Sequence, residues 1–138
     1  MDSKKLHIVA VTGLIENRGK FLIIKRIEDE VAYPGMWTVP GGKVEAPDDC
    51  RSTLSREIKE ETNLEIEDKV CFIREYGFTR PDEIHVIGLT FGCKYKSGEV
   101  KLNSDFTDFA WISLEEAKKF NLIPDILEEL QLYSSMLS

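Results

Sequence analysis

Long apolar runs are absent from this chain of 138 residues. A membrane-spanning helix needs roughly 20 consecutive apolar residues, and no stretch approaches that length. The N-terminal segment Leu6–Ile15 comes nearest, but His7 and Thr12 interrupt it and no small-residue cleavage site follows. We therefore predict a strand there, not a signal peptide, and we expect no membrane partner.

Cysteine pairs and an excess of positive charge are also missing. The three cysteines, Cys50, Cys71 and Cys93, are odd in number and form no Cys-x-x-Cys pair, which is typical of reduced core residues in a cytoplasmic protein. The net charge of −7 argues against a nucleic-acid partner, because such proteins hold phosphates with basic faces. A small phosphorylated substrate stays open, since a bound metal ion supplies positive charge locally.

Linkers, internal repeats and low-complexity segments are absent too, and the length fits one domain, residues 1–138. Segments rich in Val and Ile interleave with helical patterns without a regular βαβ order. We therefore predict an α/β fold in which a mixed sheet packs between helices. The expected strands are residues 6–15, 20–27, 37–39, 64–66, 69–78, 84–95 and 109–112. The expected helices run from Asp49 to about Asn63, from Ser113 to about Phe120, and onward from Pro124.

The segment from Gly41 to Leu64 predicts a glycine loop that leads into a helix rich in carboxylates. Asp49 suits the N-cap, and Asn63 tolerates the left-handed conformation found just past a helix end. At about 100° per residue, Glu61 falls inside the apolar arc of this helix, about 40° from Glu57. An acid in that position is buried if the helix packs on a core.

Glu57, Glu60 and Glu61 thus crowd one side of the helix, with Arg56 beside them. The alternative is an ordinary solvated face, which would explain a lone Glu-Glu pair. Burying bare carboxylates costs several kcal/mol unless they are paired or bound to metal. Because hard cations such as Mg²⁺ take oxygen ligands, the cluster predicts a divalent-metal site.

The spacing of these residues resembles the signature of the Nudix hydrolases (MutT-like), G-x5-E-x7-R-E-U-x-E-E-x-G-U, in which U is aliphatic. Asp48 stands where the family has its first Glu, and Asn63 stands where it has its last Gly. The flanking segments Trp37–Pro40 and Asp105–Trp111 extend the similarity over most of the chain. The resemblance implies a Nudix-type α/β/α sandwich with a mixed β-sheet. The residues that carry it are Gly42, Asp48, Arg56, Glu57, Ile58, Glu60, Glu61, Asn63 and Leu64.

The resemblance also implies a division of labour among the acids. Glu57 is the first candidate for the general base, and Arg56 orients the acids. Asp105 is the best match for one further acid from outside the signature, with Asp108 second, although a loop acid is the alternative for Asp105. The groups expected to hold Mg²⁺ or Mn²⁺ are the Gly41 carbonyl, Glu57, Glu60, Glu61 and Asp105.

Substrate recognition is expected outside the signature, because the acids and a metal can recognise only the diphosphate. By resemblance, Arg26 at the end of a strand faces the substrate phosphates, although a solvated strand end is the alternative. Phe78 and the loop from Asn121 to Pro124 are candidates for contacts with the base, although Asn121 also suits a plain turn. Trp37 is interpreted as a core residue, and His85 as structural.

We therefore expect a metal-dependent hydrolase that cleaves a pyrophosphate bond in a nucleoside diphosphate linked to another moiety, such as a nucleoside triphosphate or ADP-ribose. A nucleotide-sensing binding module of the same fold is one alternative, but such proteins usually lose signature acids and none is lost here. An isoprenoid-diphosphate isomerase is another, but neither Cys71 nor Cys93 has a suitable context. The expected partner is a small-molecule nucleotide, and a homodimer is left open.

Overall fold

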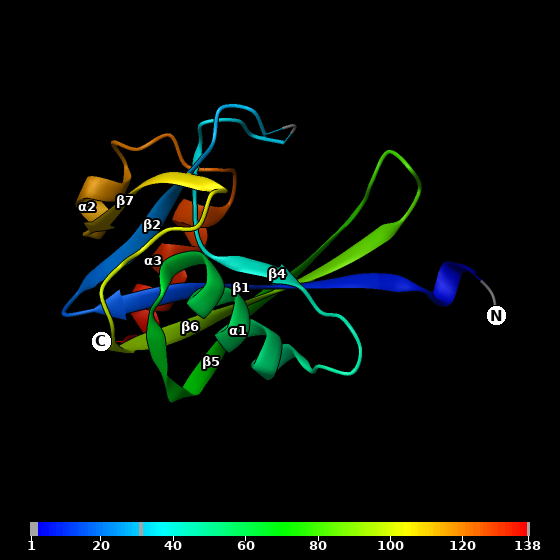
Figure 1. Cartoon of the computed structure of the whole chain (residues 1–138), viewed down its shortest axis with the longest axis horizontal. Helices are drawn as coiled ribbons and strands as arrows, with labels where there is room; N and C mark the ends of the chain where they lie inside the picture. The colour runs from blue at the N-terminus through cyan, green and yellow to red at the C-terminus, as the bar shows by residue number, and fades with distance from the viewer. Residues whose placement is uncertain (1–2, 31, 138) are drawn as a thin grey trace.

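The structure is a computed structural model that describes residues 3–30 and 32–137. No helix in these ranges is long and apolar enough to cross a membrane. The elements, labelled in Figure 1, are η1 (Ser3–Lys5), β1 (His7–Asn17), β2 (Lys20–Arg26), β3 (Trp37–Thr38), β4 (Gly41–Lys43), α1 (Cys50–Thr62), β5 (Glu65–Thr79), β6 (His85–Ser97), β7 (Phe106–Ile112), α2 (Leu114–Ala117) and α3 (Ile126–Leu137).

The strands form one mixed sheet. Five of them lie in the order β3-β2-β1-β6-β5, while β4 pairs with β1 and β7 pairs with β2. Strands β1 and β6 run parallel, from His7 beside His85 to Glu16 beside Lys94. The other described pairs are antiparallel. The predicted α/β fold with a mixed sheet is therefore confirmed.

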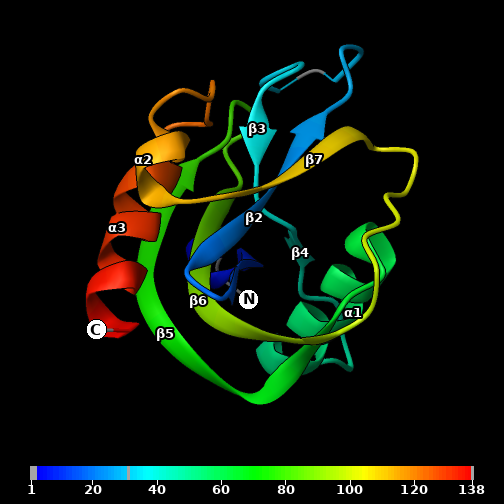
Figure 2. The ribbon, with the colours of Figure 1, turned by 90° about the vertical axis from the view of Figure 1, so that its left-hand side faces the viewer.

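Helices cover both faces of this sheet (Figure 2). Because side chains alternate along a strand, neighbouring residues of β1 enter different cores. Leu14 packs with Leu130 and Tyr133 of α3, whereas Ile15 packs with Leu54 of α1. Each fully buried side chain of this size contributes about 1.5–3 kcal/mol, so both helices are held firmly against the strands. The layers are those of the predicted α/β/α sandwich.

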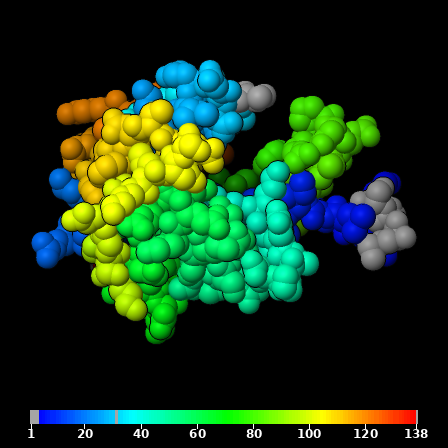
Figure 3. All heavy atoms as spheres, viewed as in Figure 1, coloured from blue at the N-terminus to red at the C-terminus, as the bar shows by residue number. Residues whose placement is uncertain are grey.

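The N-terminal part of β1 and the hairpin between β5 and β6 project beyond the helices as an arm (Figures 1 and 3). The rings of His7 and His85 meet edge to face here, with centroids 5.1 Å apart. Nδ1 of His85 lies 2.9 Å from Oγ1 of Thr79. These contacts stay within the arm, in keeping with a structural role for His85.

Two strand predictions were wrong. Residues 65–79 form the single strand β5, because the polar residues 67–69 form a bulge between the pairs Ile66–Tyr95 and Val70–Cys93 and do not end the strand. The expected glycine loop begins instead as strand β4, because β1 offers an open edge and Val11 pairs with Gly42. Strand β7 also begins earlier than predicted, at Phe106.

The two C-terminal helices also differ from their predicted bounds. The capping box at Ser113 forms as predicted, but α2 ends at Ala117 because the next amides turn back to carbonyls three residues earlier. Pro124 does not start a helix. Asp125 has a φ of 77°, which is incompatible with a right-handed helix, so α3 begins at Ile126.

The prediction that the cysteines are core residues holds only in part. Cys93 is buried, but Cys71 is exposed on the edge strand β5, so the prediction of core cysteines is wrong for Cys71. Gly88 and Gly92 of β6 lie against aromatic rings. A Cβ on Gly88 would stand 2.0 Å from the ring of Tyr76, and one on Gly92 would stand 2.3 Å from the ring of Tyr133. Close approach by these rings is the reason for both glycines.

Candidate active site

Helix α1 is fixed at both ends as the sequence predicts. Asp49 is the N-cap, and its carboxylate accepts a hydrogen bond of 2.8 Å from the amide of Ser52. This bond holds the pKa of Asp49 below its ordinary value. Asn63 ends the helix with a φ of 68°. Since Leu54 and Ile58 are fully buried, the rotation of the helix is set, and Glu57 and Glu61 lie against β4.

Glu61 is the most deeply buried acid of the predicted cluster. It is 9% exposed, and one of its oxygens accepts a 3.0 Å hydrogen bond from the amide of Gly41. Burial raises the pKa of Glu61 to about 8, although the hydrogen bond from Gly41 opposes the shift. The charge of Glu57 and a hydrogen bond with it raise that pKa further. The protein therefore supplies little compensation for a negative charge on Glu61.

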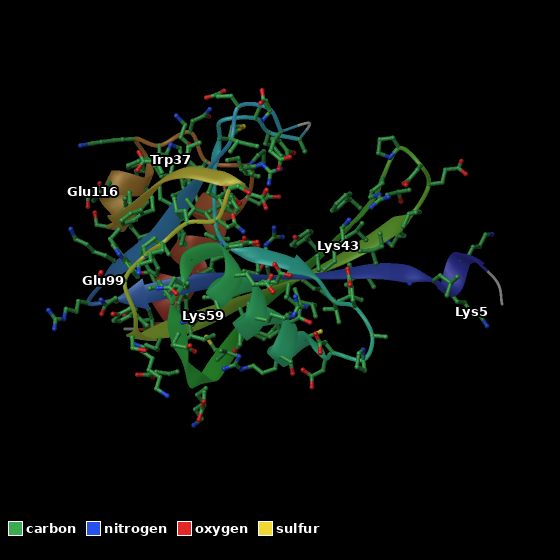
Figure 4. All side chains as sticks on the ribbon, viewed as in Figure 1. Lys5, Trp37, Lys43, Lys59, Glu99 and Glu116 are labelled. Atoms are coloured by element: carbon green, nitrogen blue, oxygen red, sulfur yellow. The ribbon has the colours of Figure 1, made fainter. Side chains whose placement is uncertain are left out.

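The glycines of β4 allow β1 and α1 to approach this strand closely, Gly41 on the β1 side and Gly42 on the α1 side. A Cβ on Gly41 would stand 2.2 Å from the carbonyl oxygen of Val11, and one on Gly42 would stand 2.4 Å from the carboxyl carbon of Glu57. Figure 4 shows β4 running along α1, with Lys43 where the strand ends and Lys59 on the helix. Burial raises the pKa of Glu57, and the charge of Glu60 adds to the shift.

Arg56 is the counter-charge of the cluster. Its guanidinium lies 3.1 Å from Glu57, 3.6 Å from Glu60 and 3.3 Å from Asp48. Asp48 therefore reaches Arg56 although it is one methylene shorter than the expected Glu. One arginine faces several carboxylates, so the cluster keeps an excess of negative charge.

The chemistry of these donors fits a divalent cation, because carboxylate and carbonyl oxygens are the ligands that hard ions prefer. In residues 3–30 and 32–137, no three Asp, Glu, His or Cys side chains converge on one point as a ready-made ion site. Arg56 holds Glu57 and Glu60, while Glu57 and Glu61 share a hydrogen bond. A cation would have to replace the ion pairs with Arg56 and the hydrogen bond between Glu57 and Glu61. It could then be bound by the three acids on one side of α1.

The two acids expected from outside the signature differ in position. The charge of Asp105 contributes to the raised pKa of Glu61, after burial and the charge of Glu57, so Asp105 lies near the cluster. The backbone carbonyl of Asp105 accepts a hydrogen bond from the amide of Ile27. Asp108 lies within β7 beside Lys25, and its carboxylate accepts the amide of Phe109. The geometry favours Asp105 as the further acid.

Comparison with known proteins decides the family. The sequence matches the family model of the NUDIX domain across residues 6–132. The chain belongs to the NUDIX domain family. It is 34% identical over 122 residues to the nucleoside triphosphatase NudI of Escherichia coli O17:K52:H18, a match that covers 81% of this chain and 86% of that protein. The predictions of a Nudix hydrolase and of a pyrophosphohydrolase enzyme are thereby confirmed.

Solved Nudix structures share the fold. The MutT protein from Methanosarcina mazei Go1 superposes with a TM-score of 0.78 and 27% identity, over 98% of each chain. The NUDIX domain of Shewanella oneidensis NrtR, solved with ADP ribose, gives a TM-score of 0.80 at 17% identity, over 100% of this chain and 94% of that one. The second likeness shows the fold alone. Nudix hydrolases in general use divalent metal ions, which agrees with the donor chemistry of the cluster.

Arg26 lies at the expected end of β2, outside the Nudix signature, but its guanidinium is engaged. Nε donates to the carbonyl of Ala32 at 3.0 Å, and Nη2 forms an ion pair with Glu30. Glu30 was not predicted as a partner of Arg26, although it follows Arg26 by four residues. Arg26 therefore contacts its own loop and no acid of the Nudix signature.

The remaining predicted residues lie on the α3 side of the sheet. Phe78 is 49% exposed on β5. The backbone carbonyl of Asn121 accepts a hydrogen bond from the amide of Trp37. Asn121 also borders a surface cavity of about 240 Å³. Trp37 packs edge to face on Phe120, with centroids 5.0 Å apart, beside the core under α3. The structure therefore brings the Nudix acids together on one side and leaves the expected base contacts on the other.

Proposed function

We propose that this Nudix domain is a metal-dependent hydrolase that cleaves a pyrophosphate bond in a nucleoside diphosphate linked to another moiety. The observation that carries the proposal is the pair Glu57 and Glu61. Two carboxylates share a hydrogen bond beside the Gly41 amide, and burial raises the pKa of Glu61 to about 8. Such a pair is a poor structural element and a good cation site, because a cation relieves both burial and repulsion.

The residues of the chain divide the work of hydrolysis. Glu57, Glu60, Glu61, Asp105 and the Gly41 carbonyl would hold Mg²⁺ or Mn²⁺. When bound, the ion supplies the positive charge that a diphosphate needs before a nucleophile can approach. Glu57 is the proposed general base, because burial raises its pKa above the ordinary value of a glutamate and so makes it a stronger acceptor of a proton from water.

Arg56 is proposed to hold these acids in register along α1. Its three ion pairs attach Asp48, Glu57 and Glu60 to one guanidinium, which fixes the position of each carboxylate. Glu61 is positioned independently of Arg56 by the Gly41 amide. The base and the buried acid are therefore oriented by different partners.

Substrate contacts are proposed for Arg26, Phe78 and Asn121. Arg26 would have to exchange Glu30 for a phosphate, which offers the same anionic oxygens. The exposed ring of Phe78 suits stacking on a base, and the Asn121 amide offers both a donor and an acceptor. The match to a nucleoside triphosphatase favours a nucleoside triphosphate as substrate, with ADP-ribose or a similar nucleotide as the second choice.

The two alternatives have less support. A nucleotide-sensing module would not need three acids along one helix side, and all three are present. An isomerase would need a reactive cysteine beside the acids, but Cys93 is buried and burial raises its pKa to about 12. The three free cysteines suit the cytoplasm, and a homodimer stays a prediction.

The test is a panel of nucleoside triphosphates and ADP-ribose, incubated with the protein and Mg²⁺ or Mn²⁺, followed by analysis of the phosphorylated products. We expect metal-dependent release of a nucleotide and a second phosphorylated fragment. The Glu61→Gln variant, assayed in parallel, controls for contaminating hydrolases. Stoichiometric binding of a nucleotide without any turnover would support the sensing module instead.

A further inference from the structure

A surface cavity of about 270 Å³ lies at the C-terminal end of α3, where this helix meets the first half of β5 (Figure 2). Its apolar wall is formed by Val70 of β5 and by Met136 and Leu137 of α3. Met136 and Leu137 are 48% and 36% exposed, so apolar surface is open to solvent at the rim. None of the described lining residues belongs to the Nudix cluster, which lies on the α1 side of the sheet.

Tyr133 brings a buried hydroxyl group to this cavity. The residue is 2% exposed. Its ring lies on Gly92 of β6, where a Cβ would stand 2.5 Å from Cζ, the carbon that carries the hydroxyl. Because Gly92 and Tyr133 both line the cavity, the hydroxyl end of the ring opens into it. Within residues 3–30 and 32–137 this hydroxyl has no hydrogen-bond partner.

The unpartnered hydroxyl defines what a ligand of the cavity must offer. The hydroxyl of a buried tyrosine usually finds a hydrogen-bond partner, so this one departs from the general pattern. Burial raises the pKa of Tyr133, and Cys71 adds to the shift. The hydroxyl therefore stays protonated at physiological pH and can donate a hydrogen bond. A ligand that satisfies it must carry an acceptor oxygen.

The charges around the cavity favour an anionic acceptor. Lys69 and Lys94 line the cavity, and Glu67 is the one carboxylate among the described lining residues. Lys94 lies 3.5 Å from Glu16, whereas Lys69 has no ion pair within the described part of the chain. The lining therefore carries an excess of positive charge, and an exposed lysine is free to reach a ligand at the rim.

We propose that this cavity binds a small fatty carboxylate, whose head group accepts a hydrogen bond from Tyr133 and pairs with Lys69, and whose tail packs on Val70, Met136 and Leu137. Ligand pockets usually measure about 300–1,000 Å³, so a cavity at the lower end of that range selects a ligand of about ten non-hydrogen atoms. This second binding site is separate from the Nudix acids and does not depend on the proposed function.

The experiment compares octanoate with octanol and octylammonium, which share its tail and differ in the head group. Octanoate can accept the hydrogen bond and pair with a lysine, octanol can accept but is uncharged, and octylammonium cannot accept. We expect affinity for the full-length protein to fall in that order, with a Kd for octanoate of about 1 mM or tighter. An NMR titration measures each Kd, and the shifted amide of Gly92 locates the site.

Cys71 gives an independent readout of occupancy, because its exposed thiol lines the same cavity. Saturating octanoate should slow the alkylation of Cys71 by iodoacetamide at least about threefold, as measured by mass spectrometry. Cys50 on α1 is the internal control, and its rate of alkylation should not change. Equal slowing at both cysteines would mean that octanoate acts on the reagent or on the whole fold, and would count against the site.

Tyr133→Phe removes the hydroxyl alone and should weaken octanoate binding about fivefold. Tyr95→Phe is the matched control, since that hydroxyl donates to the carbonyl of Gly98 away from the cavity, and it should leave the Kd unchanged. Lys69→Met, at an exposed position, should lower the preference for octanoate over octanol about threefold, and it keeps the test decisive if Tyr133→Phe folds poorly. Octylammonium binding as tight as octanoate, or an octanoate Kd that neither variant changes, would overturn the inference.

Discussion

Two glutamates, Glu61 on α1 and Glu129 on α3, are buried on opposite faces of one sheet, and their surroundings differ. Glu129 receives an arginine and a hydroxyl, both donated by the chain. Glu61 receives one backbone amide and lies against Glu57, with the charge of Asp105 acting on it as well. At similar burial, one acid has its charge compensated within the fold and the other does not.

The difference separates an acid that organises the protein from one that awaits a ligand. A buried charge without a partner is costly, so such an acid either takes up a proton or binds a cation. Glu61 meets that description and Glu129 does not. Burial alone would have given the two residues the same role, so the identity of the donors is the more informative observation.

The largest effect is expected for Glu129→Ala, which removes the buried partner of Arg74 and leaves it only the exposed carboxylate of Asp125. Breaking a buried ion pair costs about 3–5 kcal/mol, and the lower end applies because the Arg74 side chain is 33% exposed. Urea denaturation should therefore show a loss of about 3 kcal/mol in the free energy of unfolding. The neighbouring Glu128→Ala is the control, since Glu128 is exposed and should change stability by less than about 0.5 kcal/mol. If Glu129→Ala and Glu128→Ala changed stability equally, Glu129 would not be the charge-compensated acid that distinguishes it from Glu61.

Glu61→Gln should have the opposite profile. The amide keeps the shape of the side chain and removes a charge that the fold does not compensate, so the metal-free variant should be at least as stable as the wild type. Its turnover should fall at least about a hundredfold, which corresponds to about 2.7 kcal/mol of lost transition-state stabilisation. Weaker Mn²⁺ binding, measured by titration, should accompany this loss. Unchanged turnover would remove Glu61 from the metal site.

The stability of the metal-free protein should depend on pH, because the charge of Glu61 is not compensated within the fold. The pKa of Glu61 is ordinarily 4.5 and is raised to about 8 in the folded state, so the folded protein binds a proton that the unfolded chain has lost between these values. The free energy of unfolding should therefore be highest below about pH 4.5 with respect to this group, decrease as pH rises, and level off above about pH 8. The raised pKa of Glu57 acts in the same direction. We expect Tm, measured without metal, to be a few degrees higher at pH 5.5 than at pH 8.

Millimolar Mg²⁺ should reverse that decrease at pH 8, because the ion binds the folded, ionised acids. The Glu61→Gln variant should show a flatter pH profile and a smaller response to Mg²⁺. A wild-type Tm that ignores both pH and Mg²⁺ would mean that the acids are compensated in some other way.

The two sides of the molecule also differ in how far the sequence reveals them. The Nudix acids lie within one helix, so their spacing predicts their shared face, and the caps Asp49 and Asn63 define its ends. The contact of Arg74 with Glu129 joins residues 55 positions apart, and no local pattern reports it. Strand β4 was missed for the same reason, since it exists only because β1 offers an edge to its glycines.

The fold class was accessible because the strands carry enough Val, Ile and aromatic residues to be recognised singly. The limits of β5 and α3 were not accessible. Polar residues 67–69 continue β5 through a register shift, and the positive φ of Asp125 delays α3 beyond Pro124. Both features depend on pairing and packing with distant segments, and periodicity within the segment does not encode them.

The smallest effect is expected for Asp48→Glu, which extends the comparison to the arginines on the two faces. Arg74 is held by a buried acid, whereas Arg56 and its partner Asp48 are 41% and 37% exposed and lie 3.3 Å apart. An exposed ion pair contributes about 0.2–1 kcal/mol, so the extra methylene should leave kcat/KM within about threefold of the wild type or improve it. Steady-state kinetics with the preferred nucleotide measures this directly. A loss beyond about tenfold would show that the contact between Arg56 and residue 48 has been rebuilt around the shorter acid.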